Sequence, residues 1–211
     1  MNIFLLATGV TEYTSTLPNR LMASETLYFS TPPQVPRISE YMTMTEHRWR
    51  VFSGGGYLGV GPILLDVLND DVRMDAVIFL PHFYMTESFD MVTAASYSDH
   101  YEANCLASLY SLISLVEHDR LKPGAKICLL PRDVEKTSST VAYHASLHAL
   151  YSCLAGLKDT VDLFSTIQYK TFYPPSDPKP EVADQYVEDI AKFLHVPNPA
   201  SLASPEDSFY E

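Results

Sequence analysis

Short apolar runs alternate with longer amphipathic segments along this chain, and this alternation constrains its fold more than any other feature. The runs at 2–7, 75–80 and 126–130 contain few charged residues, which is typical of strands buried on both faces of a parallel sheet. The segment at 98–120 repeats its leucines and isoleucines at helical spacing. Strands that alternate with helices predict an α/β fold, a doubly wound, mostly parallel sheet with helices on both faces.

The same patterns predict the remaining elements. They are strands at 25–29, 48–52 and 161–169, a helix beginning at 62, and helices at 140–157 and 181–194. Lys122-Pro123-Gly124 predicts the end of the helix at 98–120, because proline and glycine both interrupt helices. No linker divides the chain, so we expect one domain over 1–197 and a loose acidic tail over 198–211.

Charge excludes two classes of partner. The chain has 26 acidic residues against 14 lysines and arginines, a net charge of -12. Nucleic acids and anionic membranes are bound by basic surfaces, so we expect neither as a partner. No apolar run approaches the roughly 18 residues that span a bilayer, and we expect no signal peptide, because the apolar run at 3–7 is short and no basic residue precedes it. The three cysteines are far apart and form no C-x-x-C pair, so we expect a reduced, cytoplasmic protein.

Several short motifs in the second half occur in a particular order. A buried run and proline at 75–81 come first, then Tyr-Glu-Ala-Asn at 101–104, Leu-Lys-Pro-Gly-Ala-Lys-Ile at 121–127, Tyr-His-Ala-Ser at 143–146 and Pro-Glu-Val-Ala at 180–183. In order and spacing the chain resembles the short-chain dehydrogenase/reductase family over roughly residues 1–195. The resemblance implies a Rossmann-like fold and an NAD(P) cofactor. It also implies that Asn104 and Tyr143 occupy catalytic positions and that Thr8 and Gly9 begin the cofactor loop.

The chain departs from the family at four important positions. Two later glycines of the cofactor loop, which let the backbone approach the pyrophosphate, are replaced by Tyr13 and Ser15. The lysine that follows the catalytic tyrosine is Leu147, and the catalytic serine is Leu130. We therefore expect no NAD(P) binding tighter than about millimolar. Without the lysine, Tyr143 is expected to keep the ordinary tyrosine pKa of about 10.

Other residues offer weaker candidate sites. Gly54, Gly56 and Gly59 form a G-x-G-x-x-G pattern, which is either a phosphate loop or a flexible turn. His82 follows the 75–80 strand, where it could line a cofactor cleft. His144 and His148 are four residues apart on a helix, but no third ligand accompanies them, so we expect no metal site.

Three functions remain open at this point. The first is a protein with degenerate cofactor and catalytic motifs that serves in binding or assembly. The second is an NAD(P)-dependent oxidoreductase with Tyr143 as the acid, and the third is a nucleotide or small-ligand binding regulator. In the resembled family the two long helices pair with their copies. We therefore expect a homodimer or tetramer through the helices at 98–120 and 140–157.

Overall fold

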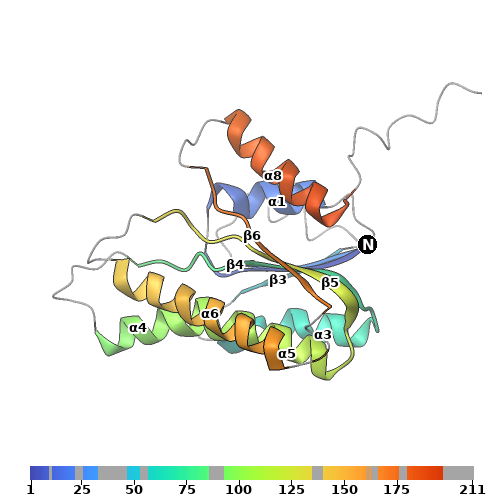
Figure 1. Ribbon diagram of the computed structural model, residues 1–211, viewed down its shortest axis with the longest axis horizontal. Helices are drawn as coiled ribbons and strands as arrows, with labels where there is room; N and C mark the ends of the chain where they lie inside the picture. The colour runs from blue at the N-terminus through green and yellow to red at the C-terminus, as the bar shows by residue number, and fades with distance from the viewer. Residues whose placement is uncertain are drawn as a thin grey trace, which may run out of the picture.

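The computed structural model places six strands in one parallel sheet with helices on both faces, which confirms the expected α/β fold (Figure 1). The described residues are 1–9, 11–21, 26–32, 47–52, 57–85, 93–134, 140–160, 162, 166–175 and 180–196. Residues 198–211, where a loose tail was expected, lie outside them. Among the described residues no helix has both the length and the apolar character that crossing a bilayer requires.

The sheet has the strand order β3-β2-β1-β4-β5-β6, and every neighbouring pair is parallel. The strands are β1 (Asn2–Ala7), β2 (Thr26–Thr31), β3 (Arg48–Val51), β4 (Met74–Leu80), β5 (Leu121–Leu129) and β6 (Gln168–Thr171). Strand order reverses between β1 and β4, and parallel α/β sheets bind their ligands at such a reversal. The candidate site is therefore sought at the carboxyl ends of β1 and β4.

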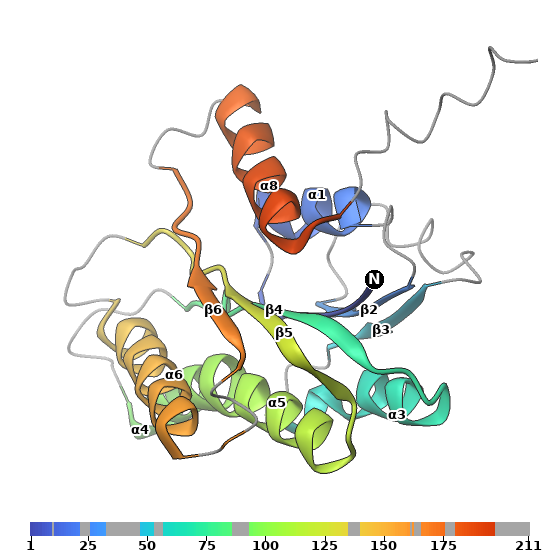
Figure 2. The same ribbon diagram turned by 45° about the vertical axis from the view of Figure 1, so that its right-hand side comes forward.

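Helices cover the two faces unequally (Figures 1 and 2). One face holds α1 (Glu12–Leu21) and α8 (Pro180–Leu194). The other holds η1 (Tyr57–Val60), α3 (Gly61–Asn69), α4 (Ala94–His100), the π-helix η3 (Tyr101–Leu106), α5 (Ala107–Glu117) and α6 (Val141–Thr160). Alternate residues of β1 enter the two cores: Phe4 and Leu6 pack toward α3 and α5, while Ile3 and Leu5 pack toward α1 and α8. Burial on both faces explains why the β1 and β4 sequences are continuously apolar.

Two boundaries expected from the sequence are wrong. The strand expected at 161–169 is β6, which begins only at Gln168, because α6 continues to Thr160. Lys122-Pro123-Gly124 does not end a helix but lies inside β5, where the pairing with β4 shifts register. Gly124 has a φ of 74°, a backbone conformation that glycine adopts readily. Proline is tolerated at such an irregular position of a strand.

The long helix expected at 98–120 is also different. It begins earlier, at Ala94, and it ends at Glu117. Thr93 caps the start, since its Oγ1 accepts a hydrogen bond from the Ser96 N–H at 3.1 Å and the Thr93 N–H donates to Ser96 Oγ at 3.1 Å. A π-helical segment, η3, interrupts the α-helical pattern in the middle. Apolar spacing alone does not reveal such an interruption, because the apolar face continues through it.

Candidate functional site

Three strand ends meet at the carboxyl edge of the sheet. Thr8 and Gly9 follow β1, His82 follows β4, and Leu130 follows β5. These neighbours are held by backbone hydrogen bonds, from the Thr8 N–H to the Leu80 carbonyl at 3.1 Å and from the Leu130 N–H to the Phe79 carbonyl at 2.9 Å. The sequence-predicted residues Thr8, Gly9 and His82 are therefore brought together by the strand order.

Thr8 and Asn104 form the centre of a buried hydrogen-bond network at this edge. Thr8 Oγ1 accepts from the N–H groups of His82 and Phe83, at 3.0 and 3.1 Å, and donates to Asn104 Oδ1 at 2.8 Å. Asn104 Oδ1 also accepts from the Phe83 N–H at 3.0 Å, and its Nδ2 donates to the Phe83 carbonyl at 2.8 Å. Both side chains are buried, so their hydrogen-bonding groups serve the β4–α4 loop at 81–85.

Gly9 is required here for a reason that involves no ligand. A Cβ on Gly9 would lie 2.3 Å from the His82 carbonyl oxygen and 2.9 Å from the Phe83 nitrogen. Any larger residue would collide with the backbone that follows β4. The glycine expected to approach a pyrophosphate therefore approaches the neighbouring loop of the protein.

His82 is buried between the ends of β1 and β5, with 2% of its surface exposed. Its Nε2 lies 2.8 Å from the Leu130 carbonyl oxygen and its Nδ1 lies 3.1 Å from Thr11 Oγ1. A carbonyl oxygen only accepts, so Nε2 bears the hydrogen and Nδ1 accepts from the threonine hydroxyl. The pKa of His82 is lowered to about 3, mainly by burial and also by the nearby Arg132 charge, against the opposing effect of the hydrogen bond to Leu130. The imidazole is thus a neutral bridge between two loops.

A second buried histidine, His100, was not identified from the sequence. Its Nδ1 donates to the Ser96 carbonyl at 2.8 Å, and its Nε2 accepts from the Met85 N–H at 3.1 Å. Its ring also packs edge-on against Phe83, at a centroid distance of 5.3 Å. His100 thus holds the far end of the loop that Asn104 holds at Phe83. No local pattern in the sequence distinguishes it from a surface histidine of α4.

Asn104 lies within the π-helix η3, on the helix layer that covers this edge. A π-turn inserts an extra residue into a helix and is frequently found at functional sites. Here it lies next to α6, and Asn104 Nδ2 donates to Ser146 Oγ at 3.3 Å. Ser146 Oγ in turn donates to the Tyr143 carbonyl at 2.7 Å. The two residues at catalytic positions, Asn104 and Tyr143, are therefore connected through Ser146.

Tyr143 is fully buried, and its hydroxyl is hydrogen-bonded to the main chain. The hydroxyl accepts from the Arg132 N–H at 2.7 Å and donates to the Arg132 carbonyl at 3.3 Å. Burial raises the pKa of Tyr143, despite the opposing hydrogen bond from the Arg132 backbone. The expectation of an ordinary pKa near 10 is therefore wrong. That expectation took account of the missing lysine, but burial also removes the phenol from water and so raises its pKa.

The surroundings of Tyr143 are aromatic and apolar. Tyr84 packs against its ring, edge to face at 5.9 Å, and the Arg132 guanidinium lies 5.2 Å from the centre of the Tyr84 ring. Leu147 and Leu130, at the positions of the family's lysine and serine, are both buried. The described residues around the phenol thus supply no lysine ammonium or serine hydroxyl at those two positions.

The other predicted site residues lie elsewhere. Gly54 and Gly56 fall outside the described residues, and Gly59 is buried in η1, which leads into α3. Tyr13 and Ser15 lie in α1, and nothing is described of their side chains. Within the described ranges, no three metal-ligating side chains gather at one point.

The described residues at this edge are engaged in contacts within the protein. The Gly9 position is filled by the His82 backbone, and the side chains of Thr8 and Asn104 are used by the loop at 81–85. His82 closes the space between the ends of β1 and β5. The Thr8, Gly9, His82 and Asn104 arrangement thus stabilises the loops at this edge.

The fold itself is found in solved structures. A carbonyl reductase from Pseudomonas aeruginosa matches with a TM-score of 0.68 and 12% identity, over 92% of this chain and 91% of that one. A short chain dehydrogenase family protein from Francisella tularensis matches with a TM-score of 0.66 and 15% identity, over 93% and 77%. BdcA from E. coli, in a structure described as a complex with NADPH, matches with a TM-score of 0.64 and 12% identity, over 96% and 89%.

Sequence comparison adds nothing to these structural matches. No family model matches the chain, and no curated protein is similar to it. At 12–15% identity the solved structures establish a shared architecture and leave the activity open. The chain therefore has the Rossmann-like fold seen in short-chain dehydrogenase/reductase structures.

Proposed function

We propose that this protein is a non-catalytic, cytoplasmic binding or assembly protein built on a dehydrogenase-like scaffold. The observation that supports this most directly is the position of the Tyr143 hydroxyl, which is buried and bonded to both backbone groups of Arg132. A tyrosine that protonates a substrate must reach it with its hydroxyl. In this protein the hydroxyl instead holds the loop that follows β5.

The replaced positions around Tyr143 support the same proposal. A tyrosine acts as an acid near neutral pH when a neighbouring cation lowers its pKa. Here the pKa is raised by burial, and Leu147 stands at the position of the cation. Leu130 likewise has no hydroxyl to orient a carbonyl substrate. A proton relay would therefore need several changes at once.

The test is carbonyl reduction with NADH and with NADPH, over a panel of aldehydes, ketones and keto acids. We expect no turnover above that of the Tyr143→Phe variant. Leu147→Lys alone is expected to remain inactive, because Leu130 still provides no hydroxyl. Reduction that depends on Tyr143 would contradict the proposal and favour the alternative of an NAD(P)-dependent oxidoreductase.

Cofactor binding is a separate measurement. BdcA, whose structure contains NADPH, shares the architecture, so the oxidoreductase alternative and the nucleotide-binding regulator both predict a dinucleotide complex. We expect dissociation constants weaker than about 1 mM for NADH and NADPH. Micromolar binding by calorimetry without turnover would favour the regulator. Micromolar binding with turnover would favour the oxidoreductase.

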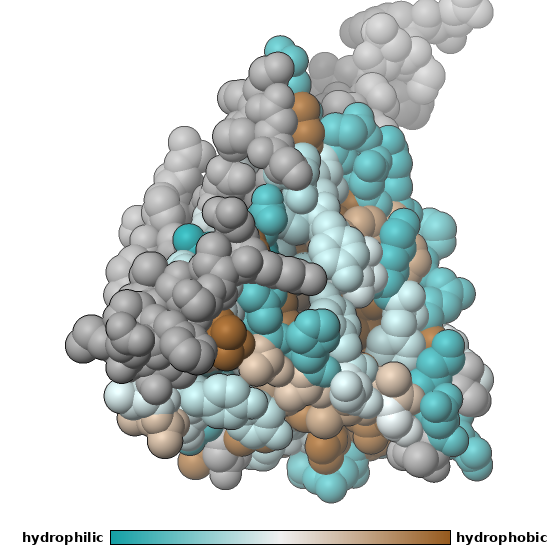
Figure 3. Space-filling view, turned by 60° about the vertical axis from the view of Figure 1, so that its left-hand side comes forward, coloured by the Kyte–Doolittle hydropathy of each residue, from teal (hydrophilic) through white to brown (hydrophobic). Residues whose placement is uncertain are grey.

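Assembly through the helix layer is the second part of the proposal. Large apolar side chains remain exposed on α4, α5 and α6, namely Tyr97 at 42%, Tyr110 at 37%, Ile113 at 41% and Val141 at 44%. Figure 3 shows brown apolar side chains among paler ones over the lower part of this face of the molecule. Contiguous exposed apolar area often marks a protein contact. We propose that a second copy covers it in a homodimer, or in a tetramer built from two dimers.

A further inference from the structure

A surface hollow of about 550 Å³ lies between the last strand of the sheet and helix α8. It is lined by Lys170, Thr171, Phe172, Tyr173, Tyr186, Asp189, Lys192 and Phe193. Strand β6 ends the order of the described sheet, so the hollow follows a sheet edge. None of the lining residues belongs to the network of Thr8, His82 and Asn104. A hollow of this size suits a small organic molecule.

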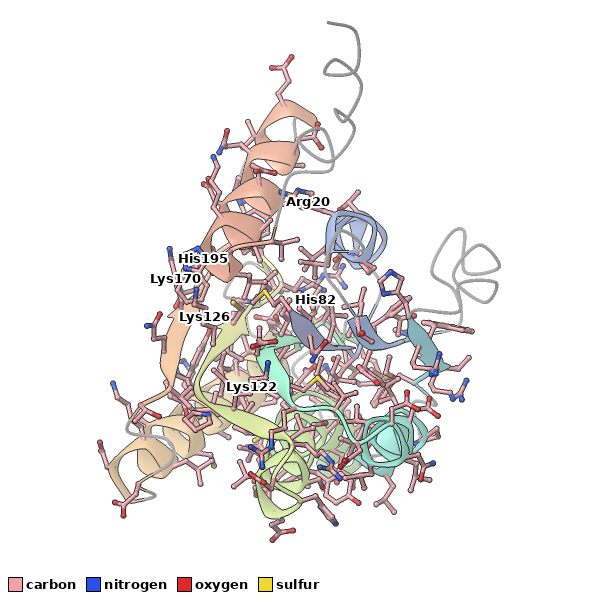
Figure 4. All side chains as sticks on the ribbon, turned by 90° about the vertical axis from the view of Figure 1, so that its right-hand side faces the viewer. Arg20, His82, Lys122, Lys126, Lys170 and His195 are labelled. Carbon is pink, nitrogen blue, oxygen red and sulfur yellow. The ribbon has the colours of Figure 1, made fainter. Side chains whose placement is uncertain are left out.

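The charges near this hollow differ from those elsewhere in the molecule. Figure 4 shows the labels of Lys126, Lys170 and His195 close together, near the end of α8. Two other labelled cations are neutralised: Arg20 pairs with Glu188 at 2.9 Å, and Lys122 pairs with Asp75 at 2.8 Å. Within the described ranges, neither Lys126 nor Lys170 has a carboxylate partner. Lys126 and Lys170 thus keep charges that no carboxylate of the described residues neutralises.

Lys126 has a structural role that accounts for its position. Its Nζ donates to the Phe193 carbonyl at 2.6 Å, where α8 ends and its last carbonyls have no partner within the helix. Its pKa is lowered by burial. This lysine is therefore already used by the protein, which leaves Lys170 and Lys192 as the lysines that line the hollow.

Lys170 and Lys192 both line the hollow, and their positive charges are only weakly neutralised by carboxylates of the described residues. Lys170 Nζ lies 4.5 Å from the centre of the Phe172 ring and 5.3 Å from that of Phe193, and such ring contacts require none of its hydrogen-bond donors. Lys192 Nζ reaches only 4.0 Å from Asp189, and both side chains are more than half exposed. Asp189 Oδ1 also accepts a hydrogen bond from Gln185 Nε2 at 2.7 Å, so the Asp189 carboxylate is shared between Lys192 and Gln185.

Aromatic rings form the walls beside these ammonium groups. Phe172 and Phe193 pack at a centroid distance of 5.7 Å, and Tyr186 donates its hydroxyl to the Phe172 carbonyl at 2.8 Å, so this wall is rigid. Tyr173 remains 71% exposed at the rim. Rings of this kind stack on planar apolar groups, while lysine ammonium groups bind anionic ones.

We propose that this hollow binds a small anion with a planar apolar body, of the aryl phosphate or aryl carboxylate class. The ammonium groups of Lys170 and Lys192 contact the anionic group, and the exposed ring of Tyr173, beside Phe193, contacts the planar body. Asp189 opposes the anion and limits its affinity. The site is independent of the proposed non-catalytic function, because it shares no residue with the network of Thr8, His82 and Asn104 or with Tyr143.

The experiment is a titration of the full chain with phenyl phosphate at low ionic strength, followed by calorimetry and by NMR. We expect saturable one-to-one binding that weakens as salt is added, because salt screens the ammonium groups. Lys170→Gln is expected to weaken binding at least fivefold, and Asp189→Asn to tighten it severalfold. Lys122→Gln, on the same sheet but paired with Asp75, is the matched control and is expected to change affinity less than twofold.

Two further ligands test separately the binding of the anionic group and the binding of the planar body. Inorganic phosphate is expected to bind more weakly than phenyl phosphate, because it lacks the planar body, and benzyl alcohol is expected not to bind. No saturable binding of phenyl phosphate at 10 mM overturns the proposal. So does equal weakening by Lys170→Gln and Lys122→Gln, since that would reflect net charge alone. Circular dichroism of each variant confirms that it is folded before its affinity is compared.

Discussion

His82 is neutral in the folded protein because its ring is removed from water and both ring nitrogens are hydrogen-bonded. Its environment thus decides its charge, as it does for the raised pKa of the Tyr143 phenol. Gly9, two residues before Thr11, is likewise defined by its environment, since a neighbouring backbone fills the space that a side chain would need. Each of these residues has a testable effect on stability.

The first prediction concerns pH. The unfolded chain protonates His82 below the ordinary pKa of about 6.5, whereas the folded protein resists protonation down to about 3. The His82 contribution is therefore fully present above pH 6.5 and is lost progressively as the pH falls toward 3. By pH 5 the loss amounts to about 2 kcal/mol of unfolding free energy. Urea unfolding at pH 7, 6 and 5 measures it.

The control for this prediction is His82→Gln, which offers an amide in place of the imidazole and cannot titrate. The variant is expected to be less stable at pH 7 but to lose less stability on acidification than the native protein. Identical pH dependence in the two proteins would contradict the burial of a neutral imidazole.

The second prediction concerns Gly9. Gly9→Ala is expected to destabilise the protein by about 2–4 kcal/mol, because the new Cβ would lie 2.3 Å from a backbone oxygen that cannot move freely. Gly156→Ala is the matched control, since a Cβ there has no neighbour within 4 Å and alanine favours the helix α6. We expect that control to be neutral or up to about 1 kcal/mol more stable. Thermal unfolding of both variants decides between these outcomes.

At the scale of elements, the loop at 81–85 depends on a helix that is distant in the sequence. Asn104 in η3 holds Phe83, and His100 in α4 holds Met85. The π-helical segment lies between the two α-helices of this layer and contains Asn104. This segment and the β4–α4 loop therefore form one structural unit, in which the side-chain amide replaces a missing backbone partner.

The third prediction tests this unit. Asn104→Ala removes one of the two acceptors of the Phe83 N–H and the side-chain donor to the Phe83 carbonyl, and it takes from Thr8 Oγ1 its partner at 2.8 Å. We expect a loss of about 2–4 kcal/mol of unfolding free energy, and faster hydrogen exchange at Phe83 and Met85. Ser108→Ala is the control. Its hydroxyl is also buried but bonds only to the Asn104 carbonyl one turn earlier in the helix, so we expect a cost below about 1 kcal/mol.

At the scale of the whole molecule, the two helix layers differ in what they leave exposed. α1 and α8 present an ion pair between Arg20 and Glu188 at 2.9 Å, whereas α4, α5 and α6 present tyrosine, isoleucine and valine. A two-fold axis beside the second layer would place the same apolar surface of two copies in contact. Assembly is therefore expected on that side of the sheet.

The fourth prediction is a homodimer or a dimer of dimers that is sensitive to charge on this layer. Ala149→Arg places a cation at the partly buried face of α6, and Ile113→Arg does so on α5. Each is expected to weaken association by several kcal/mol, about a hundredfold or more. Light scattering at tens of micromolar measures the mass. Gln185→Arg on the opposite layer is the control and is expected to leave the mass unchanged. A native monomer would contradict the assembly proposal.

The sequence by itself determined the architecture. The apolar run of β1 was located with the bounds Asn2–Ala7, and β4 within one residue, because a strand buried on both faces needs an uninterrupted apolar stretch. The amphipathic pattern likewise located α8. These are local properties, and each is set by burial of neighbouring residues along the chain. The order of the motifs then led to the fold that the solved structures share.

Only the tertiary structure decided the chemistry of the carboxyl edge. Residues far away in the sequence decide that Gly9 faces a loop and that His82 is neutral. They also decide that the Tyr143 hydroxyl bonds to the backbone of Arg132. The extents of β5 and β6 were also decided there, since each strand is defined by its pairing with a neighbouring strand. Hydrogen bonds and desolvation depend on three-dimensional neighbours, and the linear pattern of residue types does not specify these.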